Sequence, residues 1–170
     1  ARMLLELGLR QADRTMPAPG AAYEVDVVEE AAFALEQAAD RFGRARGRLA
    51  GASAGSGRGN HPPAAASVEE RRTELSRMEL QAHAALAGLL CALGENTDAS
   101  RVLQASAYLL DSAPQVANPP PLSATEWAEH CGKWALAATK VGLLPEAELA
   151  LERQRHLGAA VADAGAQLEA

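Results

Sequence analysis

Residues 86–103 read LAGLLCALGENTDASRVL, and residues 134–151 read WALAATKVGLLPEAELAL, and these two stretches decide the fold. In each, a large apolar residue followed by Ala precedes a Gly by eight positions, and Ala and Leu follow that Gly at positions five and nine. Glycine permits the tight reversal that ends a helix, and small residues such as Ala let two helix backbones approach closely. Both stretches, 48 residues apart, therefore predict an antiparallel helix hairpin.

The rest of the chain follows the same three-and-four spacing of apolar residues, which is the period of a helix with one buried face. The chain has 40 Ala and 23 Leu but only 8 Val, 5 Thr and no Ile, a composition that excludes a β-sandwich or barrel. We expect an all-α fold of three antiparallel helix hairpins, with an irregular six-helix bundle as the alternative. The expected helices are 4–13, 24–49, Ser67 to Gly94, Asn96 or Thr97 to Pro114, Ser123 to Gly142, and Pro145 to about Gly158.

Capping and linker signals mark the ends of these helices. Ser67 with Glu70, and Ser123 with Glu126, have the spacing of a capping box at a helix start. Residues 51–66 begin with a run rich in Gly and Ser, which gains little from burial, and we expect a flexible insertion there. We interpret residues 1–170 as a single helical-hairpin domain, a fragment of a longer chain because it begins with Ala1.

Charge and cysteine content limit the classes of partner. The net charge is −6, and all of it arises after Ala66, which disfavours a nucleic-acid partner. The basic run Arg41, Arg44, Arg46 and Arg48 has the spacing of a solvated helix flank. No apolar stretch reaches the length of about 18 residues that spans a bilayer, so we expect no membrane partner. Two cysteines form no disulfide framework, which favours a reducing, cytoplasmic compartment.

The paired hairpin pattern resembles the tetratricopeptide repeat, a helix-turn-helix unit with a large-apolar/small pair, a turn glycine, then alanine and a bulky apolar residue. The turn Gly142-Leu-Leu-Pro-Glu-Ala147 matches best, and Gly94-Glu-Asn-Thr-Asp-Ala99 is next. The resemblance covers residues 80–157, and the first hairpin fits loosely through Leu4, Leu7 and Gly8. It implies a short right-handed array of stacked hairpins. The separation of 48 residues exceeds the usual period of the family, and the Pro-rich connection at 118–121 accounts for the extra length.

The resemblance also implies that the first helix of each hairpin lines a groove that takes peptides. The positions that would line it are Arg2, Leu5, Leu9, Gln81, Ala84, Gly88, Cys91, Glu129, Gly132, Leu136 and Lys140. Leu5, Ala84 and Gly132 stand where some members carry a clamp for an acidic carboxyl terminus, so this groove suits a helix or an extended apolar segment. Packing against neighbouring helices is the alternative role for all of these residues.

Lys133 and Lys140, with His130 one turn before Lys133, would form an anion-contacting edge of the groove or else a solvated face. Trp127 and Trp134, two turns apart, are expected in the core. His130 and Cys131 are adjacent, so their side chains diverge on a helix and cannot share a tetrahedral metal ion.

The Gly-rich stretch follows no strand and does not end in Lys-Ser/Thr, as a phosphate-binding loop would. We therefore predict no catalytic residues, no metal and no cofactor. The predicted function is a protein-protein interaction scaffold whose partner is another protein or the rest of its own chain, in an oligomeric state that the sequence leaves open. The alternative is an accessory or regulatory helical region of a larger enzyme or transcription factor.

Overall fold

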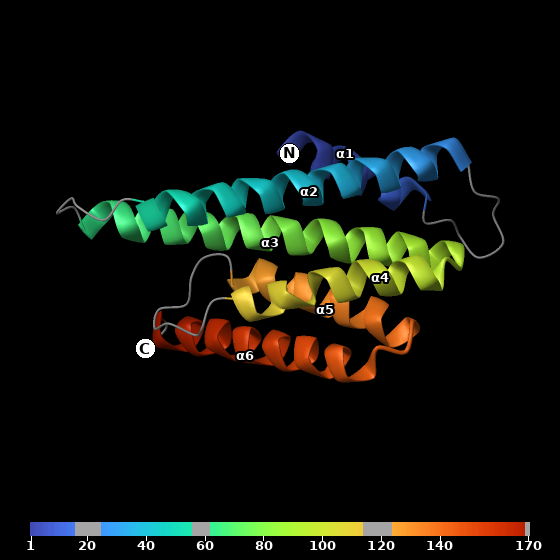
Figure 1. The fold of residues 1–170 in the computed structure, drawn as a ribbon. Helices are drawn as coiled ribbons and strands as arrows, with labels where there is room; N and C mark the ends of the chain where they lie inside the picture. The colour runs from blue at the N-terminus through green and yellow to red at the C-terminus, as the bar shows by residue number, and fades with distance from the viewer. Residues whose placement is uncertain (16–24, 56–61, 114–123, 169–170) are drawn as a thin grey trace.

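The fold is known from a computed structural model that describes residues 1–15, 25–55, 62–113 and 124–168. These residues form six α-helices and a short 3-10 helix, and none of them lies in a strand, which confirms the all-α prediction (Figure 1). The elements are α1 (Arg2–Thr15), α2 (Val25–Gly55), α3 (Pro62–Leu93), α4 (Asn96–Ser106), the 3-10 helix η1 (Ala107–Ser112), α5 (Ala124–Lys140) and α6 (Leu144–Leu168).

The helices stack in chain order, with α1 and α2 at one side of the molecule and α6 at the other (Figure 1). Helix α3 is central, because it packs against α2, α4 and α5, while α1 packs mainly on α2 and α6 mainly on α5. This arrangement agrees with the predicted three stacked hairpins, α1/α2, α3/α4 and α5/α6. The pair α2/α3 also packs over a long antiparallel contact, so the hairpins form one continuous body.

The two predicted glycine turns have the same backbone geometry. Gly94 has φ +81° and Gly142 has φ +82°, a left-handed conformation that side chains with a Cβ adopt only with strain. The amide of the residue after each glycine donates to a carbonyl oxygen five residues earlier, Glu95 to Leu90 and Leu143 to Ala138, both at 2.9 Å. This bond satisfies one of the carbonyl groups that the end of the first helix leaves without a partner in the helix.

The largest apolar core among the described residues lies between α3, α4, η1, α5 and α6, and it contains both tryptophans. Trp127 and Trp134 are completely buried there, among Leu80, Leu103 and Leu110. The core placement predicted for the two tryptophans is therefore confirmed. A second cluster, between α1, α2 and α3, is built around Leu5, Leu35, Phe42 and Met78.

Helix α1 crosses α2 at a very short distance because residue 8 is glycine. A Cβ added to Gly8 would lie 2.7 Å from Cγ of the fully buried Leu35 and 3.2 Å from its backbone nitrogen. Neither atom can move without disturbing the α1/α2 contact. Gly8 thus acts through close helix packing, and not through a turn.

Several predicted helix boundaries are wrong, and α1, α2, α3 and α6 are all longer than expected. Helix α3 begins at Pro62, so Ser67 lies inside the helix and does not cap it. Helix α2 runs to Gly55, so α2 and α3 both extend into the segment 51–66 that we expected to be a flexible insertion. Residues 56–61 of that segment lie outside the described residues. The proposed cap Ser123 lies outside them as well. Helix α6 continues to Leu168 instead of fraying after Gly158. Alanine-rich sequence has the highest helix propensity, and it outweighs the isolated glycine and serine signals.

The predicted cap of α4 is also wrong. The N-cap residue of α4 is Glu95, whose side chain forms no capping hydrogen bond, and Asn96 and Thr97 lie inside the helix. The chain enters α4 directly from the Gly94 turn, and the amide of Ala99 donates to the carbonyl of Glu95 at 3.0 Å. Helix α4 then tightens into η1, whereas we expected a single helix up to Pro114.

Candidate functional site

Four of the residues predicted to bind a partner form an exposed stripe on α5. Glu129, Lys133, Leu136 and Lys140 are all exposed, and their spacing of three and four residues puts them on one face of the helix. The Lys133 ammonium lies 2.6 Å from a carboxylate oxygen of Glu129. Leu136 is 61% exposed and is the large apolar side chain of α5 that the surface leaves open. This "α5 stripe" is the part of the predicted groove that the structure leaves open.

The other predicted groove residues are divided between surface and core. Arg2 is exposed, and Leu9, Gln81, Gly88 and Cys91 are partly exposed. A Cβ added to Gly88 would meet open space, whereas one added to Gly132 would lie 2.7 Å from the Gln154 side chain of α6.

Leu5 and Ala84 do not present a binding surface. Both are buried, Leu5 in the cluster between α1 and α2 and Ala84 in the tryptophan core. The prediction for these two residues is therefore corrected: Leu5 packs with residues of α2 and α3, and Ala84 lies on α3, which has neighbouring helices on both sides.

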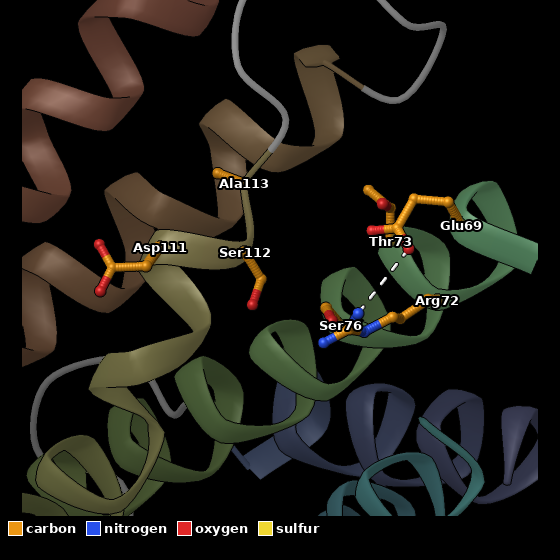
Figure 2. A pocket seen from close by; sticks show the side chains of 7 residues that line it. All are labelled: Glu69, Arg72, Thr73, Ser76, Asp111, Ser112 and Ala113. Atoms are coloured by element: carbon orange, nitrogen blue, oxygen red, sulfur yellow. Dashed lines mark ion pairs between the residues drawn. The ribbon is translucent and has the colours of Figure 1, made fainter. Parts of the chain in front are cut away.

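A polar cavity of about 350 Å³ lies between the first half of α3 and the end of η1 (Figure 2). Glu69, Arg72, Thr73 and Ser76 line it from α3, and residues 111–113 line it from η1 and the residue after it. The Arg72 guanidinium and the Glu69 carboxylate form an ion pair of 3.7 Å on its wall. The cavity offers the hydroxyls of Thr73, Ser76 and Ser112, the carboxylates of Glu69 and Asp111, and the guanidinium of Arg72.

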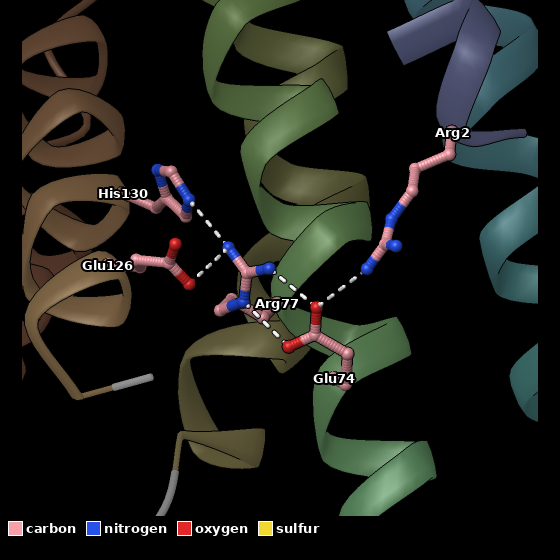
Figure 3. Close-up of polar contacts among 5 residues, drawn as sticks. All are labelled: Arg2, Glu74, Arg77, Glu126 and His130. Carbon is pink, nitrogen blue, oxygen red and sulfur yellow. Dashed lines mark hydrogen bonds and ion pairs between the residues drawn. The ribbon is translucent and has the colours of Figure 1, made fainter. Parts of the chain in front are cut away.

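A polar cluster around a buried arginine joins residues of α1, α3 and α5, one helix from each hairpin (Figure 3). Arg77 of α3 is only 8% exposed, and it donates to both carboxylate oxygens of Glu74, at 2.8 and 2.6 Å. Its Nη1 lies 3.0 Å from a carboxylate oxygen of Glu126 and 3.3 Å from Nε2 of His130, both on α5. Arg2 of α1 approaches Glu74 at 3.7 Å. We call these five residues the Arg77 cluster.

The Arg77 cluster corrects the prediction for His130. This side chain is buried against Arg77 and cannot form an exposed anion-contacting edge with Lys133 and Lys140. Because Arg77 can only donate, Nε2 of His130 accepts, and the imidazole is neutral. Burial, together with the positive charge of Arg77, lowers the pKa of His130 to about 4. The hydrogen bond from Arg77 lowers the pKa of Glu74 below its ordinary value.

Acid is therefore expected to destabilise the fold through His130. The unfolded histidine binds its proton near pH 6.5 and the folded one only near pH 4, so the free energy of unfolding falls as the pH drops through this window. The loss is of the order of 3 kcal/mol. Urea unfolding at a series of pH values measures it. His130→Gln should show a shallower decrease than the wild type, and equal slopes would contradict the assignment.

A second polar cluster lies on the opposite side of α3. The Arg46 Nε donates to Glu79 at 3.0 Å, the Arg46 Nη2 donates to the Tyr108 hydroxyl at 2.8 Å, and that hydroxyl donates to Glu79 at 2.6 Å. The Glu79 side chain is almost completely buried, and burial with the Glu79 contact raises the pKa of Tyr108 to about 12. Arg46 is thus a member of a partly buried network and not the solvated flank predicted from the basic run.

Sequence reasoning missed both clusters. Arg77 and Glu79 lie in the charged segment 69–79 of α3, which by itself resembles a solvated helix end. The only available signal is that this segment continues the apolar period through Leu75, Met78 and Leu80, so that charges are interleaved with core positions.

Within the described residues, no three or more His, Cys, Asp or Glu side chains are grouped so that they could hold a metal ion. No helix in this part of the chain is long and apolar enough to cross a membrane. Comparisons with protein-family models, with curated proteins and with solved structures give no match to this chain.

Proposed function

We propose that this chain is a protein-binding scaffold of tetratricopeptide-like helical hairpins, and that its partner docks on the α5 stripe. The observation that carries the proposal is Leu136, which is 61% exposed and stands between Lys133 and Lys140 on the same face. Burying one leucine side chain completely contributes about 1.5–3 kcal/mol, enough for an anchor residue of a small interface. The proposal includes no reaction, metal or cofactor.

The charges beside Leu136 indicate the chemistry of the partner segment. Lys133 is paired with Glu129 within the stripe, whereas within the described residues no acidic group forms an ion pair with Lys140. A partner helix or extended segment that combines an apolar side chain with a neighbouring acidic one would contact Leu136 and Lys140 together.

The opposite face of α5 holds the stripe rigidly in place. Trp127 and Trp134 are fully buried there, and Glu126 and His130 join α5 to the Arg77 cluster. A surface that is already ordered loses little conformational entropy when a partner binds. The partner therefore meets a preformed face, as the scaffold proposal requires.

Replacing Leu136 with glutamate is expected to remove binding. The immobilised chain would be incubated with a cell extract, and the proteins it captures would be quantified by mass spectrometry. The introduced carboxylate loses the apolar contact and adds repulsion against an acidic partner, so we expect recovery to fall about tenfold or more.

Phe33→Glu is the matched control for this experiment. Phe33 of α2 is 63% exposed, almost equal to Leu136, but belongs to another helix. The Phe33→Glu variant should capture the same proteins as the wild type. Circular dichroism should show that both variants, Leu136→Glu and Phe33→Glu, are folded. Undiminished recovery with Leu136→Glu, or equal losses in both variants, would argue against the α5 stripe as the docking surface.

A further inference from the structure

Helix α6 is the last element of the stack, and one of its faces has no neighbouring helix in the described part of the chain. The helix packs on α5 through Ala147, Ala150, Leu157 and Ala160, which are all buried. Leu144 and Leu151 remain 57% and 37% exposed. Two leucines left open on one helix face, beside charged residues, form a surface that another molecule can cover.

This outward face of α6 is hollowed and charged. A cavity of about 590 Å³ lies on it, lined by Leu151, Ala159, Glu148, Glu152, Arg155 and His156. Four residues of this face follow one another along α6 at intervals of four, three and four residues: Leu144, Glu148, Leu151 and Arg155. This is the spacing of a helix seam that contacts a second helix.

Glu148 and Arg155 are complementary to each other but cannot pair within one helix. They are seven residues apart, which is a rise of about 10 Å along the axis, and neither forms an ion pair with another described residue. Both side chains are exposed and solvated, and a second helix that crosses the face with the opposite order of charges would pair with both.

An antiparallel second copy of α6 would offer a partner of opposite charge to both Glu148 and Arg155. A two-fold axis near the middle of the 148–155 segment places Glu148 opposite Arg155 of the second copy, and Arg155 opposite Glu148 of the second copy. A parallel copy would instead place like charges opposite each other, which is unfavourable. Leu144 and Leu151 then lie along the same seam and lose exposed area.

We propose that the chain self-associates as a two-fold dimer through the outward face of α6, joined by reciprocal Glu148–Arg155 ion pairs. This interface uses a different helix from the α5 stripe and does not depend on the proposed partner binding. Two leucines from each copy and two ion pairs make a small interface, so the dimer is a reversible one whose population rises with concentration.

Charge reversal tests the pairing directly. Sedimentation equilibrium of the chain over a wide concentration range should show the mass rising from the monomer value of 17.7 kDa toward twice that value. Glu148→Arg or Arg155→Glu alone should weaken association about tenfold or more, because each creates two like-charge contacts. The double variant, with both charges reversed, restores the reciprocal pairs and should associate within about threefold of the wild type.

The control is Glu29→Arg, an equal charge change at an exposed position of α2, which should leave association unchanged. Three results would overturn the proposal: a monomer at every concentration, a dimer indifferent to the single reversals, or a double variant no better than the singles. Leu136→Glu should still dimerise, and the charge-reversed chain should still capture the partner of the α5 stripe. Failure of one proposal is thereby distinguished from failure of the other.

Discussion

Replacing Arg77 with alanine should lower the free energy of unfolding by about 3 kcal/mol. The change removes the buried cation that contacts Glu74, Glu126 and His130, and it leaves Glu74 with the longer 3.7 Å contact to the exposed Arg2. Glu74 and Glu126 are themselves partly exposed, so water can solvate them, and the effect lies at the lower end of the range for buried ion pairs. Urea unfolding monitored by circular dichroism measures the difference.

The control for Arg77 is an arginine with the same kind of partner at the surface. Arg101 pairs with Asp98 at 2.9 Å with the same three-residue spacing as Arg77 and Glu74, but its side chain is largely exposed. Arg101→Ala should cost only about 0.5 kcal/mol or less, because water replaces the lost contact. Equal losses for the two alanine variants would show that Arg77 does not connect the hairpins. Arg77→Met keeps much of the side-chain volume but removes the charge, so its free energy of unfolding, compared with that of Arg77→Ala, separates the contribution of packing from that of charge.

Replacing Trp134 with alanine should cost about 4 kcal/mol, the largest effect of any change considered. The side chain is completely buried in the main core, and its removal leaves a cavity between α5 and α4 that the surrounding helices can fill only in part. The variant should unfold at a much lower urea concentration than the wild type. A loss below about 1 kcal/mol would contradict the packing described for this core.

Phenylalanine variants of the two tryptophans isolate the contribution of one hydrogen bond. Trp134 Nε1 donates to Ser106 Oγ at 3.0 Å, whereas the buried Nε1 of Trp127 has no hydrogen-bond partner in the described part of the chain. Trp134→Phe loses a buried hydrogen bond, while Trp127→Phe removes an unpaired donor. Trp134→Phe should therefore be the less stable variant by about 1–2 kcal/mol, and the reverse order would refute the difference in bonding.

The turns and the core could be predicted because their signals are local. A glycine at position 94 or 142 with apolar periodicity on both sides favours a reversal whatever lies beyond it, and the structure gives both the same left-handed geometry. Trp127 and Trp134 lie two turns apart on a single apolar face, which determines that they are buried together. The helix ends were less predictable, since the alanine-rich flanks at 64–66 and after Gly158 continue the helices past the expected stop signals.

The candidate sites were less accessible to sequence reasoning, because exposure depends on which helix lies beside which. Leu5 and Leu136 are both leucines on the first helix of a hairpin, yet one is buried under α2 and the other is open. His130 and Lys133 are three residues apart on α5, but His130 turns toward Arg77 of another hairpin while Lys133 pairs with Glu129. No pattern along one helix contains this information.

By itself, the sequence determined that this chain is built of helices, where two of its hairpins reverse, and which tryptophans form the core. These features depend on backbone propensity, on the freedom of glycine and on the period of apolar residues, all of which act within one or two helices. Only the tertiary structure decided that Arg77 and Glu79 are core charges, that Leu136 stays exposed and that α6 has an open face. The stability of a buried charge depends on partners brought from other hairpins, and exposure depends on which helices are absent from a face, so both are properties of the assembled stack.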